Sequence, residues 1–524
     1  MENNRTDPSA LRYPRDPTEG SPPSAPCWWS RHFWPFILAA LVVKVMIGWL
    51  VPLTGDEAYF YIWGMHPALG YYDHPPMVGW WMTLILHVGR HPLLLRALAI
   101  MATMLPAVGL YIGLRARDEH QARRVGLVAL FLPLFMIGVL ITTDTPMFIF
   151  GLFAIFFCQH GLSKKNKLAF LASGIFLGLA FLGKYFAALI GIAFIVHFLF
   201  FARKMWFGLV LIIIGALPAI GLNLYWNWNH SWYNVMFNLV NRHDDRGLQW
   251  ENLPLYIVMM IYLIMPWVLW QLIRHRVRVW EGLRQSQQNL WITTSAAPLG
   301  LLLMLAPMAR IGLHWVIVFL PGILLACYYL PVNALVRCVR YSAIFCGLHV
   351  LLLALALALP LNLLEEHRRY GDIVFYLRPW LISEFFQDYP DDTLLFSRGY
   401  SGSAVLSYYT GRYFGVLGTG SRYGRQDDII TDFRIYDGAD MVYLMRPRER
   451  EPDRLFPFFE EVTIREVHTK GVTFRLLEGK GFRYPVYRDT VLMDVFDRYY
   501  QRPTWLPEGR CLFSKRYFPD SLQQ

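Results

Sequence analysis

The chain has 524 residues, of which 55% are hydrophobic and 16% aromatic, while only 17% are charged. Soluble globular domains carry about 25% charged residues, so this balance excludes an ordinary soluble protein and indicates an integral membrane protein. The net charge is +11, but most of the excess lies in connections between hydrophobic segments. We therefore attribute the charge to membrane orientation and contact with anionic lipids, and we expect no nucleic-acid partner.

The chain begins with a polar, Pro- and Ser-containing stretch over residues 1–32. It has no signal-peptide pattern, and we expect a disordered cytoplasmic tail. Apolar segments close to the roughly 20 residues that span a bilayer core then recur to residue 361. We predict about eleven membrane-spanning helices, at 33–52, 93–114, 125–141, 145–162, 168–183, 186–202, 207–224, 254–273, 290–307, 315–333 and 342–361.

Lys and Arg residues occur in every second connection between these helices, for example Arg115 and Arg117, Lys164 and Lys165, and Arg274. Short cytoplasmic loops are enriched in such residues. The pattern predicts a cytoplasmic N-terminus and an outer C-terminal region. It also places the connection after the first helix on the outer face.

This first outer connection concentrates polar and aromatic residues within the sequences T-G-D-E-A-Y-F-Y-I-W and G-Y-Y-D-H-P-P. Carboxylates at a membrane surface beside aromatic rings suit chemistry on a sugar attached to a lipid. For the tyrosines, anchoring at the membrane interface is an equal alternative to sugar binding. The candidate site residues of this connection are Asp56, Glu57, Tyr59, Tyr72, Asp73 and His74.

Other outer connections add an acid and several cations. Asp144 stands in T-T-D-T-P, Lys184 and Tyr185 in G-K-Y, Arg242 in N-R-H-D-D-R and Arg310 in A-R-I-G-L-H-W. The cations are candidate partners of a phosphate group, since Arg holds two phosphate oxygens at once. Helix capping by Asp144 and extension of Lys184 to the lipid headgroups are the structural alternatives.

After residue 361 the composition becomes charged and rich in turns, which predicts a soluble domain over residues 362–524. A β-run at 393–397, a helix at 403–409 and β-runs at 413–417 and 471–477 indicate an α/β fold. The six cysteines form no disulfide framework and no C-x-x-C metal site.

The D-E pair, Y-Y-D-H-P-P, T-T-D-T-P, G-L-A-F-L-G-K-Y, N-L-Y-W-N-W-N-H-S-W and the late H-W together resemble the GT-C membrane glycosyltransferases. Within that family, they resemble the bacterial branch related to protein O-mannosyltransferases and to the lipid A aminoarabinose transferase. The resemblance covers most of residues 33–335. It implies an inverting transferase of the bacterial inner membrane that takes a sugar from a polyprenyl-phosphate donor to a lipid A, lipopolysaccharide, other glycan or protein acceptor on the periplasmic face.

The resemblance also implies roles for individual residues. Asp56 matches the first-loop catalytic Asp, with Glu57 beside it, Asp144 matches the second-loop acid, and Lys184 with Tyr185 matches a pair at the cavity. One position departs from the pattern. The aminoarabinose transferases carry an acidic residue and Lys before the two prolines, where this chain has Asp73 and His74, so another cation or His74 takes the place of that Lys, or the donor sits differently.

A divalent cation is a candidate cofactor. The carboxylates offer hard oxygen ligands for Mg²⁺, Mn²⁺ or Ca²⁺, and Asp73 with His74 could contribute to a Zn²⁺ site. Two other functional classes remain as alternatives: a transporter or flippase for a polyprenyl lipid or glycolipid, and a non-catalytic envelope assembly protein. The gathering of polar residues in outer connections, with no evident internal repeat, favours the enzyme over the transporter.

Overall fold

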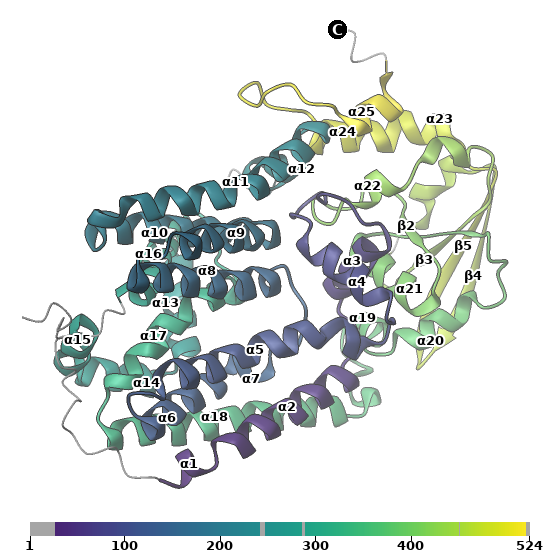
Figure 1. Cartoon of the computed structure of the whole chain (residues 1–524). Coiled ribbons are helices and arrows are strands. Elements are labelled where there is room, and N and C mark those ends of the chain that lie inside the picture. The colour runs from purple at the N-terminus through teal and green to yellow at the C-terminus, as the bar shows by residue number, and fades with distance from the viewer. Residues whose placement is uncertain (1–26, 242–246, 286–288, 450, 520–524) are drawn as a thin grey trace, which may run out of the picture.

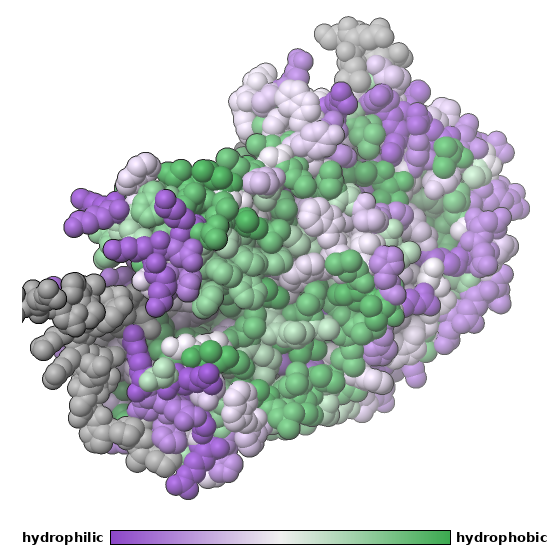
Figure 2. All heavy atoms as spheres, in the orientation of Figure 1, coloured by the Kyte–Doolittle hydropathy of each residue, from purple (hydrophilic) through white to green (hydrophobic). Residues whose placement is uncertain are grey.

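The protein consists of a long helical region followed by a C-terminal α/β domain (Figure 1). A computed structural model describes residues 27–241, 247–285, 289–449 and 451–519, so most of the tail predicted over residues 1–32 lies outside the described residues. Hydrophobic residues gather over the helical region, and hydrophilic residues cover the end near α1 and the surface of the C-terminal domain (Figure 2). This distribution is that of a membrane protein with one large polar domain.

Five helices of the described chain are long and apolar enough to cross a membrane, or six if the bent pair α13 and α14 counts as one span. This number stands below the eleven predicted spans, because several predicted segments form shorter or broken helices. The helices of this region are α1 (Trp28–Arg31), α2 (Phe33–Leu50), α3 (Gly55–Met65), α4 (Met77–Leu86), α5 (Pro92–Leu114), α6 (Glu119–Leu130), α7 (Pro133–Ile137), α8 (Asp144–Lys164), α9 (Lys167–Gly183), α10 (Ala188–Phe200), α11 (Trp206–Asn229), α12 (Tyr233–Val235), α13 (Asn252–Ile264), α14 (Pro266–Arg274), α15 (Arg276–Gln285), α16 (Asn289–Leu305), α17 (Leu320–Ala326) and α18 (Val332–Ala358).

Prolines explain several of the breaks. The predicted helix 125–141 divides into α6 and α7 before Pro133, and 254–273 divides into α13 and α14 before Pro266, where the axes differ by 87°. A proline has no N–H for the preceding turn and clashes with it. The first outer connection differs from its prediction as well, because it contains two helices, α3 and α4, with an irregular segment between them.

Small residues allow helices α9 and α11 to pack closely. A Cβ atom on Gly174 would lie 2.1 Å from the carbonyl oxygen of Ile212, and one on Gly215 would lie 2.5 Å from that of Leu171. Helices in membranes associate through such close contacts between small residues. Helix α9 also packs against α8, where the Ser173 hydroxyl donates to the Ala154 carbonyl 2.8 Å away. These helices form the rigid support beneath the candidate site.

The C-terminal domain is built on a five-stranded sheet of order β2-β1-β3-β5-β4. The first three strands in this order are parallel and the last two antiparallel, with Leu395 opposite Phe414 and Val442. The α/β character expected for this region is therefore present. Its elements are α19 (Tyr370–Leu377), α20 (Pro379–Ser383), β1 (Leu394–Ser397), α21 (Tyr400–Thr410), β2 (Phe414–Val416), α22 (Asp427–Ile430), β3 (Met441–Met445), β4 (Glu461–Thr469), β5 (Val472–Lys480), α23 (Tyr484–Tyr487), α24 (Met493–Tyr499) and α25 (Leu512–Tyr517).

Helix α21 connects this domain to the helical region by packing against α3 (Figure 1). The two helices approach so closely that a Cβ atom on Gly55 would lie 1.7 Å from the Ser401 hydroxyl. On the same side, the Tyr409 hydroxyl accepts from the backbone N–H of Leu53 and the Tyr408 hydroxyl donates to the carbonyl of Arg90. The sheet is thus held against the outer ends of α2, α3 and α5.

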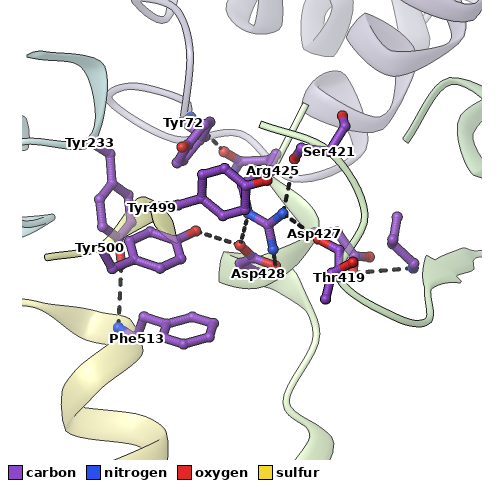
Figure 3. A network of polar contacts seen from close by, with 12 residues as sticks. Tyr72, Tyr233, Thr419, Ser421, Arg425, Asp427, Asp428, Tyr499, Tyr500 and Phe513 are labelled. Atoms are coloured by element: carbon purple, nitrogen blue, oxygen red, sulfur yellow. Dashed lines mark hydrogen bonds and ion pairs between the residues drawn. The ribbon is translucent and has the colours of Figure 1, made fainter. Parts of the chain in front are cut away.

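A second attachment centres on the buried Arg425 (Figure 3). Its guanidinium donates to both carboxylate oxygens of Asp428, at 2.6 and 3.1 Å, and lies 4.5 Å from the centre of the Tyr499 ring. The Tyr500 hydroxyl donates to the same carboxylate. The neighbouring Gln426 side chain accepts from the backbone N–H of Tyr72 in the first outer connection, 2.9 Å away. This network joins the C-terminal domain to the connection that carries the candidate site.

Replacing Arg425 with Ala is expected to destabilise the attachment strongly, because Asp428, whose side chain is 14% exposed, would lose its cation, and breaking a largely buried ion pair costs about 3–5 kcal/mol. The unfolding temperature of the full-length protein in detergent would fall by several degrees. Lys480→Ala is the matched control, since it removes a cation from an exposed pair with Glu461, worth about 1 kcal/mol or less. Equal unfolding temperatures for the two variants would contradict the role of Arg425.

Candidate active site

A cavity of about 850 Å³ lies between the outer ends of the helices and the C-terminal domain. Segments far apart in the chain meet there: the start of α3, the residues before α4 and α8, the residue after α9, one face of α13, the segment around residue 312, and, from the C-terminal domain, the start of α21 and one loop. Its polar and aromatic lining comprises Asp56, Tyr59, Phe60, Asp73, His74, Thr142, Thr143, Lys184, Phe237, Tyr262, Arg310, His314, Trp315, Tyr400 and Tyr423.

Asp56 presents its carboxylate to this cavity from the first turn of α3, and its side chain is exposed. The N-terminus of a helix favours a negative charge at this position. The Tyr400 hydroxyl, which comes from the C-terminal domain, donates to Asp56 Oδ1 over 3.1 Å. Burial raises the pKa of Tyr400, and the neighbouring Asp56 carboxylate raises it further, so Tyr400 acts as a neutral hydrogen-bond donor to Asp56.

Glu57 has different surroundings although it is the next residue. Its side chain is 1% exposed and accepts from Arg96 Nε at 2.8 Å and Nη2 at 2.7 Å. It also accepts from the backbone N–H of Thr54, whose hydroxyl accepts from the Glu57 N–H, so the two form a capping box at the start of α3. Glu57 does not belong to the cavity lining.

Arg96 completes this arrangement from helix α5. It is fully buried, and besides Glu57 it donates to the carbonyls of Gly48, Val51 and Pro52 at the end of α2, at 2.7–2.9 Å. Every contact therefore satisfies a group that would otherwise be buried and unpaired. The pair joins α2, α3 and α5 and orients Asp56 toward the cavity.

Asp144 and Lys184 form the second buried ion pair. Lys184 Nζ lies 2.8 and 2.7 Å from the two carboxylate oxygens of Asp144, and both side chains are buried. His314 Nε2 approaches the same carboxylate at 3.5 Å. Lys184 lines the cavity, whereas Asp144 lies behind it at the start of α8. The pair holds a cation at the cavity wall.

The other predicted residues divide into two groups. Tyr59, Asp73, His74 and Arg310 line the cavity, and the Tyr59 hydroxyl accepts from the backbone N–H of Gln426 at 3.0 Å. Burial, followed by the charge of Asp73, raises the pKa of Tyr59.

The second group lies outside the cavity lining. The Tyr72 hydroxyl accepts from Asn241 at 3.1 Å, close to the Arg425 network, and the Tyr185 hydroxyl contacts Asn223 and Asn234 at 3.2 and 2.5 Å. Arg242 lies outside the described residues. The structure thus brings most of the predicted residues together, and it places these tyrosines in supporting positions.

One side of the cavity is apolar. Leu255, Val258, Met259 and Tyr262 recur along α13 at the spacing of one helix face and all line the cavity. Leu255 is 44% exposed and Val258 62% exposed, so this face also opens to the surroundings. A cavity with charged groups at one end and an exposed apolar helix face at the other suits a ligand with a polar head and a hydrocarbon chain.

The residues described here provide no group of three or more His, Cys, Asp or Glu side chains able to hold a metal ion. Asp73 and His74 line the same cavity, but a protein site for Zn²⁺ or Ca²⁺ ordinarily needs at least three protein ligands. Mg²⁺ needs only one or two carboxylates when substrate phosphates complete its coordination, so a divalent cation at this cavity stays a prediction.

Known proteins resemble this chain in sequence and in fold. A family described as dolichyl-phosphate-mannose-protein mannosyltransferase matches residues 73–226. The lipid A galacturonosyltransferase RgtD of Rhizobium johnstonii is 24% identical over 336 residues, which cover 59% of this chain and 67% of that protein. The resemblance to GT-C membrane glycosyltransferases is confirmed.

Solved structures show a likeness of fold over most of the chain. ArnT from Cupriavidus metallidurans bound to undecaprenyl phosphate superimposes with a TM-score of 0.59 at 14% identity, over 85% of this chain and 97% of that chain. The same protein in the apo state gives a TM-score of 0.57 at 13% identity over the same shares. At these identities the likeness concerns the fold, which this chain shares along almost its whole length.

Three features of the site escaped the sequence prediction. The pattern T-G-D-E at residues 54–57 is a capping-box signature, and it could have separated Glu57 from Asp56. Arg96 lies within an apolar segment, where an ionisable residue signals a buried partner. No local pattern marked Tyr400, because its contact with Asp56 spans 344 positions in the sequence.

We expect Glu57→Gln to destabilise the protein, because it leaves the buried Arg96 guanidinium without a charged partner at a cost of about 3–5 kcal/mol. Asp56→Asn changes the neighbouring carboxylate in the same way at an exposed position, and we expect a shift within about 0.5 kcal/mol. Thermal unfolding of the purified variants in detergent measures both. A Glu57→Gln protein with wild-type stability and no transferase activity would instead place Glu57 in the chemistry.

Proposed function

We propose that this protein is an inverting glycosyltransferase that moves a sugar from a polyprenyl-phosphate donor to an envelope acceptor. The observation that carries the proposal is the single cavity that combines the exposed carboxylate of Asp56, the cations Lys184 and Arg310, and the apolar face of α13. A lipid-linked sugar phosphate presents the complementary groups. The similarity to RgtD, a lipid A galacturonosyltransferase, and to ArnT, solved with undecaprenyl phosphate bound, supports this class of donor and acceptor.

In the proposed reaction Asp56 is the general base. An acceptor hydroxyl attacks the anomeric carbon of the donor as Asp56 takes its proton. The bond between the anomeric carbon and the phosphate oxygen breaks, and polyprenyl phosphate leaves with the bonding electron pair. Attack opposite to the leaving group inverts the anomeric centre. The exposure of Asp56 within the cavity supports this role, because the acceptor must reach the carboxylate directly.

The cations stabilise the phosphate as it gains negative charge. We assign Lys184 and Arg310 to this role, with His74 and Asp73 at the donor sugar and phosphate. Asp144 positions Lys184 through their 2.7–2.8 Å contacts, and Glu57 supports Asp56 structurally. Pairing with the buried Asp144 holds Lys184 at the cavity wall, where it can contact the donor phosphate.

The prenyl chain is proposed to lie along α13. Its exposed leucine and valine side chains continue from the charged part of the cavity to the hydrophobic surface of the helical region. Burial of a hydrocarbon chain there is favourable by about 25 cal/mol per Å² of apolar surface. The lipid thereby contributes binding energy while its phosphate remains at the cations.

We further propose that the cavity faces the periplasm of a bacterial inner membrane. Helix α15, which carries Arg276, Arg278 and Arg284, lies at the opposite end of the helical region from the sheet (Figure 1). Basic residues favour the cytoplasmic side, which supports an outer position for the C-terminal domain. In this arrangement the tail at 1–32 is cytoplasmic, residues 33–361 contain about eleven shorter and longer membrane segments, and residues 362–524 are periplasmic.

Asp56→Asn is expected to reduce transfer by a factor of about 10²–10⁴, the usual contribution of a general base. Mass spectrometry of envelope lipids and glycans would compare a deletion strain complemented with wild type or with the variant at equal membrane levels. Asp392→Asn, an exposed change in the C-terminal domain, is the matched control. Full restoration of the modified product by Asp56→Asn would exclude Asp56 as the base and favour a transporter or assembly role.

Tyr400→Phe should lower kcat about tenfold without changing the KM of the donor, because one hydrogen bond to a charged acceptor contributes about 1.5 kcal/mol. The ring and its packing against Tyr59 remain. Tyr408→Phe removes another hydroxyl of α21, one that donates to the Arg90 carbonyl instead, and should retain kcat. Steady-state kinetics with both variants would refute the positioning role of Tyr400 if their kcat values were the same.

A further inference from the structure

A second cavity, of about 650 Å³, lies within the C-terminal domain and shares no lining residue with the candidate active site. Its rim is formed by the segments that follow the three parallel strands. Arg398 follows β1, residues 417–420 follow β2, and Arg448 follows β3. The carboxyl ends of these strands therefore converge on one hollow.

The topology of the sheet makes this edge a favourable binding position. Strand β1 lies between β2 and β3, so the chain leaves β1 toward one neighbour through α21 and later returns to the other side. In open α/β sheets, ligands bind outside the carboxyl ends of the strands where the strand order reverses in this way. The second cavity occupies that position.

The charges around the cavity leave guanidinium groups available to an anion. Arg498 pairs with Asp494 at 2.7 Å, and Arg454 pairs with Glu451. The remaining acid of the lining, Glu449, accepts from the Tyr443 hydroxyl at 2.9 Å and lies 3.5 Å from Arg446, which is outside the lining. All three acids of the lining are thus already matched by other groups.

Arg398 and Arg448 are the two guanidiniums of the lining that pair with none of its three acids. Arg398 is exposed and makes no hydrogen bond or ion pair with another residue that the structure describes. Arg448 pairs at 3.4 Å with Asp372, an acid outside the lining that also lies 3.5 Å from Arg446, and the Arg448 side chain is 46% exposed. Two such groups on neighbouring strands match the oxygens of a phosphate, which Arg binds in pairs.

The loop after β2 adds an accessible backbone. Gly418 and Gly420 have φ angles of +98° and +60°, which L side chains rarely adopt, and they flank Thr419. No atom lies within 4 Å of the position that a Cβ atom on Gly418 would take. A ligand can therefore approach this backbone closely, as glycine-rich loops allow.

The remaining surface of the cavity is apolar and aromatic, with Tyr443, Met445, Phe458 and Val491 among its residues. A phosphate ion alone would leave most of 650 Å³ empty. A sugar ring fits better, because its C–H faces pack on aromatic rings while its phosphate reaches the arginines. The chemistry of the cavity is that of a phosphorylated saccharide site.

The same loop connects the second cavity with the first. Thr419 lies in the second cavity and Tyr423 in the candidate active site. The segment that joins these two residues is held by Arg425, which donates to the carbonyls of Thr419 and Ser421 at 2.8 and 2.9 Å (Figure 3). A ligand held in the second cavity would lie one ordered loop away from the site of transfer.

We propose that the second cavity binds a phosphorylated saccharide, the headgroup of the acceptor glycolipid. That this ligand is the acceptor glycolipid rests on the function proposed above, whereas the binding of a sugar phosphate does not. The site would select acceptors by a phosphate distant from the hydroxyl that receives the sugar.

Isothermal titration calorimetry of the full-length protein in detergent tests the site with glucose 1-phosphate, glucose and inorganic phosphate as probes. We expect glucose 1-phosphate to bind at least tenfold more tightly than either other probe, and Arg398→Ala to weaken its binding at least tenfold. Arg483→Ala is the matched control, because Arg483 is exposed, lies in the same domain and is absent from the cavity lining. Inorganic phosphate binding as tightly as glucose 1-phosphate would overturn the saccharide assignment.

Two further variants separate this site from the active site. The binding event that Arg398→Ala weakens should persist in Arg310→Ala; loss of that event in Arg310→Ala with its retention in Arg398→Ala would overturn the proposal, because the probe would then occupy the first cavity. Asp56→Asn should bind glucose 1-phosphate as the wild type does. A loss of transfer in this variant is thereby distinguished from a loss of binding in the second cavity. In a transfer assay Arg398→Ala should raise the KM of the acceptor and leave that of the donor, and the opposite pattern would contradict the acceptor role.

Discussion

The buried ion pair between Arg96 and Glu57 is the interaction on which the site depends. Two charges in an environment of low dielectric constant are stable only when both are paired and their remaining hydrogen bonds are satisfied. Here the guanidinium also binds the last carbonyls of α2, and the carboxylate closes the capping box of α3. The start of α3 is thereby held at the ends of α2 and α5. Asp56 is the residue before Glu57 and lies on a different face of α3, so this anchoring leaves its carboxylate in the cavity.

The C-terminal domain forms part of the cavity wall. Helix α21 packs on α3, Tyr400 donates to Asp56, and Tyr423 forms part of the wall. The Arg425 network holds the loop that carries Tyr423 against the first outer connection. Both domains therefore contribute groups to one site, which explains why a compact soluble domain accompanies the membrane helices. The loop after β2 also borders the second cavity, so the proposed acceptor site and the candidate active site share one loop.

Charge and hydrophobicity are divided within the active-site cavity as a lipid-linked donor requires. Asp144 keeps a cation at the wall, Arg310 adds a second one, and the exposed face of α13 continues toward the hydrophobic surface. The sequence relatives share little identity with this chain, yet the fold is similar to ArnT over 85% of its length. Such a fold can retain its architecture while individual residues of the cavity change. His74, at the position before the two prolines, is an example.

The sequence by itself determined the membrane class, the α/β character of the C-terminal region and the connections that carry the candidate residues, because hydrophobicity, charge and strand periodicity are local properties. Asp56, Asp73, His74, Lys184 and Arg310 could be chosen for the same reason: polar groups next to apolar helices stand out in a linear pattern. Only the tertiary structure decided that Asp56 is exposed and Glu57 buried, that Asp144 binds Lys184, and that α21 delivers Tyr400. These outcomes depend on contacts between segments up to several hundred residues apart, and the energy of a buried charge is set by the partner that the fold brings to it.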